Sequence, residues 1–446
     1  MLDILKKGGI LVWVIAAIIL AIVLGSVRIG QWHLIPVEVG HVFATFSGLF
    51  GQFLSFAIPL IIIGLVTPAI ADLGHGAGKW LGITAAFAYG STIFAGLVTW
   101  LACALVLPRV LPSSLAQVKE PGSAFENYFA AIEITPVMGV VTALVLSFVL
   151  GVGLSLIPRG VLRKGFIEFR AIITKVIDRI IIPLLPIHIF AIFLNLTYTG
   201  EVWHIMQTLM AVVVVVLVLE VIILFSQYTL AGIIARKNPL TALMAMLPAY
   251  FTALGTSSSA ATIPVTLKSA KKLGVSDSVA NFTIPLCATI HLAGSTSKIF
   301  AFAFAIVFTQ GIAVTPAQWI GFIFMLGVTM VAAPGVPGGA IMAASGVLTS
   351  MLGFDEAAMG LMIASYVALD SFGTATNVTG DGAISLIINK LTGGNLNGSE
   401  DLENARELSF DGMAYLDKVS VPGLVSPEDL ENSAAANNGA TPPSSQ

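Results

Sequence analysis

Apolar runs long enough to cross a lipid bilayer recur along this chain. The first, "GGILVWVIAAIILAIVLGSV", covers residues 8–27. A helix needs about 20 such residues to span a hydrocarbon core about 30 Å thick. Only 10% of the 446 residues are charged and 57% are hydrophobic, whereas a soluble domain carries about 25% charged residues. The sequence therefore predicts an all-α integral membrane protein.

The runs change character near residue 235. Before it they are long and uninterrupted, and no small-residue cleavage pattern follows the first, which we expect to be an uncleaved span. The predicted spans lie near 8–27, 41–70, 81–108, 137–157, 172–198 and 205–234. Beyond 235, Gly, Pro, Ser and Thr interrupt "FTALGTSSSAATIPVTL" (251–267) and "VAAPGVPGGAIMAASG" (331–346), which accompany longer segments near 278–309 and 354–390.

The placement of Lys and Arg predicts a topology, because these residues gather in cytoplasmic loops. With the N-terminus inside, the predicted outer loops hold only Arg28, Arg109 and Lys119. The predicted cytoplasmic segments hold Lys6, Lys7, Lys79, Arg159, Arg163, Lys164, Arg236 and Lys237. Lys268, Lys271 and Lys272 put both ends of 251–267 inside, so 331–346 must re-enter from outside. We predict eight transmembrane helices plus two oppositely oriented re-entrant hairpins, in the cytoplasmic membrane, with both termini in the cytoplasm.

Three parts follow from this pattern. We expect residues 1–235 to form six helices and residues 236–392 to contain both hairpins. The polar segment 393–446 is expected to be a disordered cytoplasmic tail. Cys103 and Cys287 lie far apart within apolar spans and predict neither a disulfide nor a metal site. The net charge of −3 gives no indication of nucleic acid, and no such partner is predicted.

A polar face stands out in "LDSFGTATNVTGDG" (369–382). Asp370, Thr374, Asn377 and Asp381 are spaced by 4, 3 and 4 residues, which is one face of a helix. A polar stripe could serve only to join helices, but ionisable groups inside membranes are costly and usually functional. Short, Gly- or Pro-interrupted segments are typical of transporter binding sites. The polar face and the interrupted segments together predict a site near the midplane.

The interrupted segments resemble one family. "GTSSSAATIPVTLKSAKKLGVSDSVANFTIPLCATIH" resembles the serine-rich first hairpin and seventh helix of the dicarboxylate/amino acid:cation symporter family, the glutamate transporter family. "APGVPGGAIM" is similar to its second hairpin and "TNVTGD" to the core of its eighth helix. The likeness covers roughly 40–390. It implies an elevator-type fold that is usually a homotrimer. In such a fold, residues 1–235 would serve mostly as scaffold. Residues 236–392, with the hairpins and the last helices, would form the mobile transport core that moves the substrate.

The resemblance also implies roles for individual residues. The positions that contact substrate, including the tip of the gating hairpin, are Ser257, Ser258, Ser259, Val336, Pro337, Gly338, Asp370, Thr374 and Asn377. The positions that hold sodium are Asp381, Asn377, Thr289, Ser91 and Thr92. Asp370 and its neighbours would hold the amino group and the carboxylate of the substrate. Sodium is expected as the coupled ion, with no covalent cofactor.

The chain departs from the family pattern at three places. His291 and Ala293 stand where the seventh helix usually carries a sodium-site asparagine and aspartate, and His291 is a candidate proton carrier because an ordinary histidine titrates near neutral pH. Gly373 stands where carriers of acidic amino acids place an arginine. Lys298 stands at a place usually held by an aromatic residue. If Lys298 reaches the space beside Gly373, it could meet a substrate carboxylate; otherwise it could neutralise Asp370 or replace a sodium ion.

The leading hypothesis is a secondary active symporter that imports a small carboxylated solute, an amino acid or a four-carbon dicarboxylate, coupled to sodium. A proton-coupled carrier or a neutral-amino-acid carrier of the same fold is the alternative, and a channel or substrate sensor is a further one. A membrane enzyme is disfavoured, because 11 residues separate Asp370 from Asp381, about 16 Å along a helix. Two carboxylates that share one catalytic step lie closer together.

Overall fold

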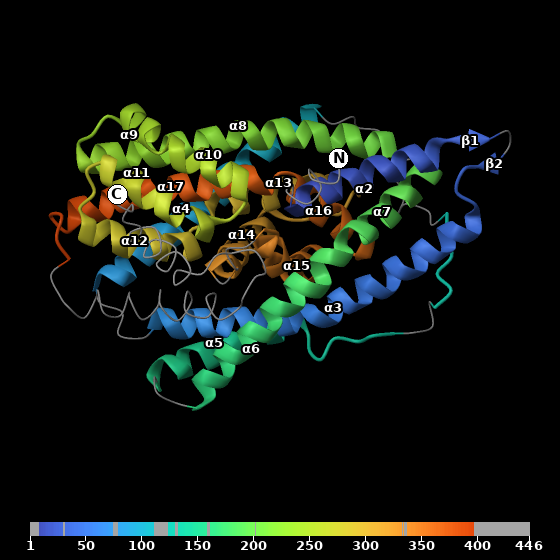
Figure 1. Ribbon diagram of the computed structural model, residues 1–446, viewed down its shortest axis with the longest axis horizontal. Helices are drawn as coiled ribbons and strands as arrows, with labels where there is room; N and C mark the ends of the chain where they lie inside the picture. Colours follow the sequence, from blue (N-terminus) through green and yellow to red (C-terminus); the bar gives the residue numbers. More distant parts are fainter. Residues whose placement is uncertain are drawn as a thin grey trace, which may run out of the picture.

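The computed structural model describes residues 9–29, 32–74, 79–110, 124–129, 133–157, 161–200, 202–331, 333 and 337–396. Within this part of the chain the secondary structure is helical apart from a short antiparallel pair, β1 (Arg28–Ile29) and β2 (Trp32–His33). Helices of very different length lie side by side in an elongated body (Figure 1). The prediction of an all-α protein is confirmed for the described residues.

Long helices dominate the first half of the chain. They are α2 (Gly9–Ser26), α3 (Val37–Gly74), α4 (Lys79–Val110), α5 (Val140–Leu156), α6 (Val161–Val176), α7 (Ile182–Tyr198) and α8 (Val202–Ala235). A π-helical turn, η2 (Ile177–Ile181), joins α6 to α7 without a break. The predicted span at 172–198 therefore starts too late, because α6 carries charged residues that lower its hydropathy although it continues the same helix.

Shorter helices follow residue 235. They are α9 (Pro239–Ala245), α10 (Leu247–Thr256), α11 (Ser259–Lys272), α12 (Asp277–Ile290), α13 (Ala293–Thr309), α14 (Pro316–Val331), α15 (Gly339–Leu352), α16 (Glu356–Ala368) and α17 (Asp370–Leu391). Both interrupted segments break as predicted, the first at Ser257 and Ser258. The longer segments near 278–309 and 354–390 are also interrupted, at His291–Leu292 and at Leu369, where α16 and α17 meet at 60°.

Length and composition allow five of the described helices to cross a membrane, or seven if each bent helix pair counts as one span. The bent pairs are α9 with α10 and α16 with α17. The helices α2, α5, α14 and α15 are apolar but shorter. The predicted count of eight spans and two re-entrant hairpins stays a prediction.

The buried apolar side chains form one large cluster, shared by α2, α3, α5 and α7 with α13 to α16, and a smaller one mainly among α9 to α12 and α17. The helices α3, α5, α6 and α7 pack against one another, and α2 packs on α7. The helices α4 and α8, although they precede residue 235, pack against α13 and α17. Figure 1 shows α8 running along the side of the molecule that holds α10, α11 and α17. The predicted division of the chain at residue 235 stays a prediction. The helices α4 and α8 precede this residue but pack against helices that follow it.

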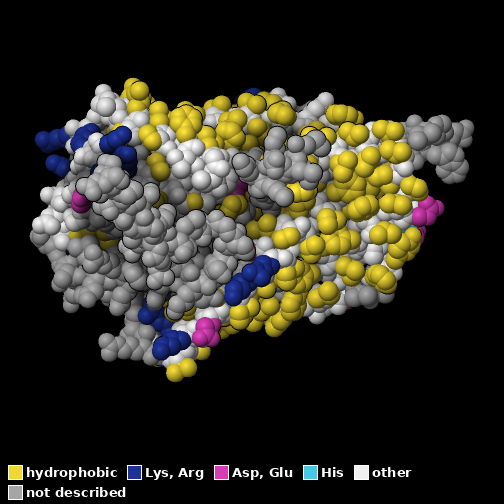
Figure 2. Space-filling view, in the orientation of Figure 1, with side chains coloured by type: hydrophobic (Ala, Val, Ile, Leu, Met, Phe, Trp, Pro, Cys, Tyr) yellow, Lys and Arg dark blue, Asp and Glu magenta, His cyan; other side chains and the backbone are white. Residues whose placement is uncertain are grey.

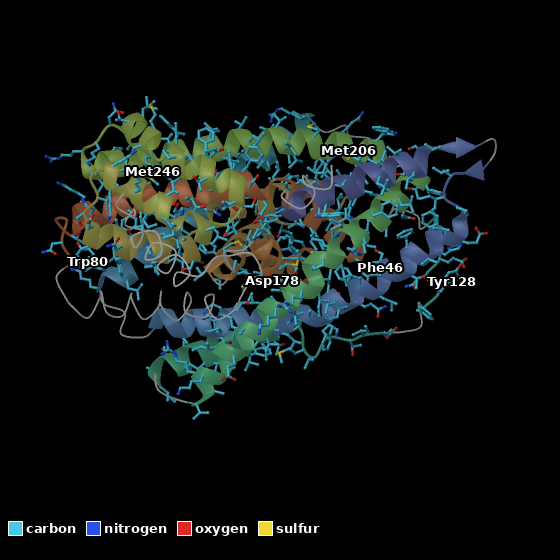
Figure 3. All side chains as sticks on the ribbon, viewed as in Figure 1. Phe46, Trp80, Tyr128, Asp178, Met206 and Met246 are labelled. Atoms are coloured by element: carbon cyan, nitrogen blue, oxygen red, sulfur yellow. The ribbon has the colours of Figure 1, made fainter. Side chains whose placement is uncertain are left out.

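The surface and the interior agree with a lipid environment. Exposed apolar side chains follow α8, among them Val214, Val218 and Val221, and Figure 2 shows hydrophobic side chains over much of this face. Side chains fill the spaces between the helices (Figure 3). Met246, labelled there, packs against α17 at Gly382, where an added Cβ would lie 2.7 Å from its Cε. Close approach to α17 therefore depends on its glycines.

Candidate functional site

Three helix breaks meet at the N-terminal half of α17. One lies between α12 and α13, one precedes α15 at Gly338, and one separates α16 from α17. Each break frees backbone N–H or C=O groups that a continuous helix would have paired. Hydrogen bonds from all three converge on Asp370, Asn377 and Lys298. The structure thus brings these three predicted site residues together.

Lys298 is the buried cation of this cluster. Its ammonium donates hydrogen bonds to the carbonyl oxygens of Leu369 at 3.0 Å and Asp370 at 3.2 Å. It lies 3.6 Å from Asp370 Oδ1 and 4.2 Å from the ring centroid of Tyr366. The carbonyls, the carboxylate and the ring face each contribute negative potential. The Lys298 ammonium is therefore held by the protein itself and is fully buried.

Gly373 makes this position possible. A Cβ on Gly373 would lie 2.2 Å from Lys298 Cε and 2.5 Å from Nζ, closer than real Cβ contacts. The lysine thus occupies the space that a side chain at Gly373 would fill, and it lies beside Asp370, the alternative partner that the sequence analysis left open. The Asp370 carboxylate is shared between two partners. Its Oδ1 faces Lys298, and its Oδ2 accepts a hydrogen bond from the Gly338 N–H at 2.7 Å. Thr374 donates to the Asp370 carbonyl oxygen at 2.9 Å.

Asn377 ties α17 to the N-terminus of α13. Its Oδ1 accepts hydrogen bonds from the N–H groups of Gly294 at 2.8 Å and Ser295 at 3.3 Å. Its Nδ2 donates to Ser295 Oγ at 3.0 Å, and Tyr366 donates to the same oxygen at 3.2 Å. Asn377 therefore satisfies donors that the α12–α13 break leaves free.

Asp381 lies one turn further along α17 and contacts His291. His291 Nδ1 is 2.9 Å from Asp381 Oδ1, and its Nε2 is 3.0 Å from Ser91 Oγ. Gln227 donates to the same Ser91 oxygen at 2.8 Å. The second carboxylate oxygen of Asp381, Oδ2, is buried and has no hydrogen-bond partner in the part of the chain that the structure describes. An oxygen in this state fits a hard cation such as sodium, which takes oxygen ligands.

Serines form the turn between α10 and α11, which is the tip of the first predicted hairpin. Ser257 has φ +50°, a left-handed conformation that few residues other than glycine adopt, and it ends α10. Ser258 begins α11, where its side chain accepts from the Ala261 N–H at 3.3 Å. Ser259 is buried. In the second hairpin, Val336 lies outside the described residues, while Pro337 and Gly338 form the turn before α15.

The remaining predicted sodium residues are engaged locally. Thr289 is exposed and donates to the Leu286 carbonyl oxygen at 2.7 Å. Thr92 is buried and donates to the Ala88 carbonyl oxygen at 2.9 Å. Of the predicted sodium-site hydroxyls, Ser91 therefore lies in the His291–Asp381 cluster, whereas the hydroxyls of Thr289 and Thr92 bond their own helices. Their roles stay predictions.

Three site neighbours were missed by sequence reasoning. Glu220 and Gln227 are buried on α8, and Tyr366 is buried on α16. The one sequence signal for Glu220 is an acid within an apolar helix. Gln227 and Tyr366 gave no signal, because their proximity depends on how α8 and α16 pack. Both contact residues that the sequence did identify.

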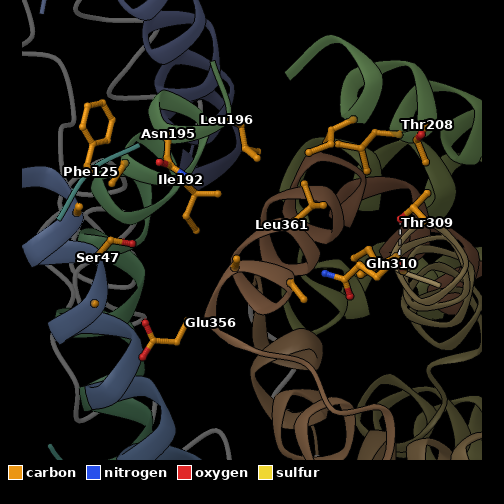
Figure 4. Close-up of a pocket in the computed structure, with 18 of the residues that line it drawn as sticks. Ser47, Phe125, Ile192, Asn195, Leu196, Thr208, Thr309, Gln310, Glu356 and Leu361 are labelled. Carbon is orange, nitrogen blue, oxygen red and sulfur yellow. Dashed lines mark hydrogen bonds between the residues drawn. The ribbon is translucent and has the colours of Figure 1, made fainter. Parts of the chain in front are cut away.

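Two cavities lie outside the Lys298 cluster. One, of about 340 Å³, separates α3 and α7 from α13 and α16 (Figure 4). Ser47, Asn195 and Glu356 supply polar groups to its lining, and none of the described predicted site residues lines it. The other, of about 510 Å³, is lined by Ser91 and Gln227 together with residues of α4, α8 and α17. It therefore borders the His291–Asp381 cluster.

Buried carboxylates, an ammonium and the ends of broken helices are the kinds of groups with which membrane transporters bind charged solutes. A sequence profile of the sodium:dicarboxylate symporter family matches residues 10–391. The chain belongs to this family, and so it is a multi-pass membrane transporter and not an enzyme. The family resemblance predicted from the motifs is confirmed.

Two kinds of relatives illustrate the similarity. A serine/threonine transporter of Acinetobacter baumannii (strain AYE) is 27% identical over 395 residues, which cover 82% of this chain and 94% of that protein. An excitatory amino acid transporter of Caenorhabditis elegans is 28% identical over 258 residues, 56% of this chain and 51% of that protein. Family and relatives together indicate a symporter of amino acids.

Gly338→Ala should weaken substrate binding about tenfold. Gly338 has φ +75°, and no atom of the described residues lies within 4 Å of an added Cβ, so the cost is conformational, about 1–2 kcal/mol. This conformational cost falls on the turn whose Gly338 N–H donates a hydrogen bond to Asp370. Gly353→Ala is the matched control, with φ +71° and equally open space at the other end of α15. We expect a similar loss of thermal stability in both, and weaker binding only in Gly338→Ala. Equal binding in the two variants would contradict a role for this tip.

Proposed function

We propose that this protein imports a small neutral amino acid, such as serine, threonine or alanine, together with sodium. One observation carries the choice of substrate: the Lys298 ammonium is already bound by Asp370, two carbonyl oxygens and the Tyr366 ring. A second substrate carboxylate in this buried site would need a cation of its own, since an unpaired buried charge costs several kcal/mol. The relatives described as serine/threonine transporters support the same substrate class.

The backbone groups of an amino acid fit the polar face of α17. Asp370 would accept the substrate ammonium, and Asn377, Thr374 and the N–H groups near Gly338 would bind its carboxylate. The serine turn at 257–259 would close the other side. The dicarboxylate in the family's name and the four-carbon dicarboxylate of the leading hypothesis are less suited, because Gly373 supplies no positive charge and Lys298 is engaged.

Sodium is proposed as the coupled ion, with Asp381 as its principal ligand. The unpartnered Oδ2 of Asp381 supports this, because a buried carboxylate oxygen needs a cation or a donor. The free carbonyl oxygens at the end of α12 could complete the ligand set. Ala293 has no side-chain oxygen, so we expect fewer sodium ions per substrate than in relatives with an aspartate there.

Binding measurements on the purified protein test the substrate. Serine, threonine and alanine should bind at fixed sodium and pH, and aspartate and succinate should bind much more weakly. Lys298→Met with Gly373→Arg should bind aspartate better than the wild type, because an arginine then replaces the engaged lysine. Tight binding of succinate and no binding of serine by the wild-type protein would refute the proposal.

His291 separates sodium coupling from proton coupling. His291→Gln keeps a side chain able to hydrogen-bond Asp381 but cannot carry a proton at neutral pH. Sodium-driven uptake into proteoliposomes should persist in this variant. His188→Gln is the control, since His188 is a second buried histidine, 2.9 Å from Ser47 on the scaffold side. Uptake that needs a pH gradient and is lost only in His291→Gln would favour a proton carrier.

We also propose a membrane architecture for this protein, on the basis of the family resemblance. Eight spans, two opposed hairpins and a homotrimer are what the family resemblance implies, with α4, α8 and the later helices in the mobile core. Lys and Arg gather at the end of the molecule where α9 and α11 lie (Figure 2), among them Lys268, Lys271 and Lys272. By the rule that places positive loops inside, we propose that this end faces the cytoplasm, together with both termini.

A further inference from the structure

A second buried carboxylate, Glu220 on α8, lies near the Lys298 cluster. Glu220 is 3% exposed, and among the described residues its carboxylate oxygens make no hydrogen bond of normal geometry, although the Thr376 hydroxyl lies close to them. Lys298 is paired with Asp370, whose Oδ1 lies 3.6 Å from its Nζ, and Glu220 forms no ion pair among the described residues. A buried carboxylate left unpaired is expensive, so Glu220 needs a cationic partner in some state of the transporter.

The space between Lys298 and Glu220 lies against the backbone of Gly373. A Cβ on Gly294 would lie 2.7 Å from both Glu220 Oε2 and the Gly373 carbonyl oxygen, and 2.8 Å from Thr376 Cβ. A Cβ on Gly373 would lie 2.5 Å from Lys298 Nζ. The Glu220 carboxylate thus borders Gly294, which precedes Lys298 by one turn of α13. The Lys298 ammonium borders Gly373, whose carbonyl oxygen also faces Gly294.

Asp370 cannot serve two ammonium groups equally well. Its Oδ2 accepts from the Gly338 N–H, and Lys298 lies beside its Oδ1. If a substrate ammonium binds Asp370, as the proposed function requires, it competes with Lys298 for one carboxylate. Two cations at one buried anion repel each other. The lysine must then lose its proton or find another anion.

We propose that Glu220 is the second counter-ion of Lys298, which turns from Asp370 to Glu220 when the ammonium of the substrate binds Asp370. Without substrate, Lys298, Asp370 and Glu220 together carry a net charge of −1. A substrate ammonium brings the net charge of the cluster to zero. The single pair of Lys298 with Asp370 is then replaced by two pairs, Lys298 with Glu220 and the substrate ammonium with Asp370. The cluster therefore selects solutes that carry an amine, which deepens the proposed function and rests on it. Glu220 acts through Lys298 and is a positioning residue.

A double-mutant cycle on serine binding tests the coupling between the two residues. The dissociation constant is measured at fixed sodium and pH for the wild type, Glu220→Gln, Lys298→Met and the double variant. Glu220→Gln should weaken serine binding at least tenfold in the wild-type background, because Lys298 then stays on Asp370. It should change binding less than twofold in the Lys298→Met background. Non-additivity of this size identifies interacting residues.

Two further variants guard the interpretation. Glu220→Asp keeps the carboxylate and should retain more of the wild-type affinity than Glu220→Gln, with no effect in the Lys298→Met background. If Glu220→Gln fails to fold, Glu220→Asp supplies the same cycle. Glu356→Gln, which removes a carboxylate of α16 outside the cluster, is the control and should bind serine as the wild type does.

The results that would overturn this inference can be told apart from those that would overturn the proposed function. An equal loss of affinity in both backgrounds would overturn the inference, and a shifted sodium dependence would then make Glu220 a cation ligand. Wild-type affinity in Glu220→Gln would overturn the inference alone and leave the proposed function standing. A wild-type protein that binds only succinate would contradict both, because succinate has no amine.

Discussion

Asn377→Ala should reduce substrate uptake by at least about 100-fold while the protein still inserts into the membrane. Asn377 accepts hydrogen bonds from the Gly294 and Ser295 N–H groups and donates to Ser295 Oγ. Alanine leaves two buried N–H groups unpaired, at about 1–3 kcal/mol each, and removes an amide from the polar face. Uptake into proteoliposomes at matched protein density measures the loss.

Asn389→Ala is the matched control on the same helix. Asn389 Oδ1 also accepts a backbone hydrogen bond, from Ser276 at 2.9 Å, but near the far end of α17. We expect near-normal uptake and a modest loss of thermal stability in this variant. If the two alanine variants transported equally well, Asn377 would have only a structural role and the assignment of the site to this face would fail.

Asp370→Asn should abolish substrate binding and also destabilise the protein. Asp370 is the carboxylate beside Lys298, and an asparagine there removes the counter-ion that pairs with this buried ammonium in the structure. Removing one partner of a buried ion pair costs about 3–5 kcal/mol. Thermal unfolding in detergent measures the stability, and equilibrium serine binding measures the function.

Asp370→Asn combined with Lys298→Met separates these two effects. The double variant has no unpaired ammonium, so its unfolding temperature should return toward that of the wild type. Serine binding should stay lost, because the acceptor for the amine is still missing. Recovery of both properties would mean that Asp370 serves only to neutralise Lys298, and the amine would then bind elsewhere.

The sequence predicted the polar face of α17 because a spacing of 4, 3 and 4 is a local property of one helix. It left open whether Lys298 reaches the space beside Gly373, because that depends on how α13 packs against α17. It did not predict the breaks at His291 and Leu369, since the apolar pattern continues across both. Without these breaks the N-terminus of α13 could not face Asn377.

Glu220, Gln227 and Tyr366 could not be placed from sequence for a different reason. Each approaches the site through packing of helices that lie far from α17 in the chain. Glycines of α17 permit that approach: a Cβ on Gly380 would lie 2.6 Å from Gln227 Oε1 and from His291 Cε1. Glycines in a helix indicate close approach of a neighbour, but they do not identify which neighbour approaches.

Uptake of labelled serine into proteoliposomes under an imposed inward sodium gradient, with pH equal on both sides, tests the central proposal most directly. The account predicts accumulation above the external concentration, collapse of that accumulation when sodium is equalised, and no accumulation by Asn377→Ala. Concentration-driven equilibration without accumulation would indicate a channel. Accumulation of succinate but not of serine would contradict the proposed substrate and the engagement of Lys298 on which it rests.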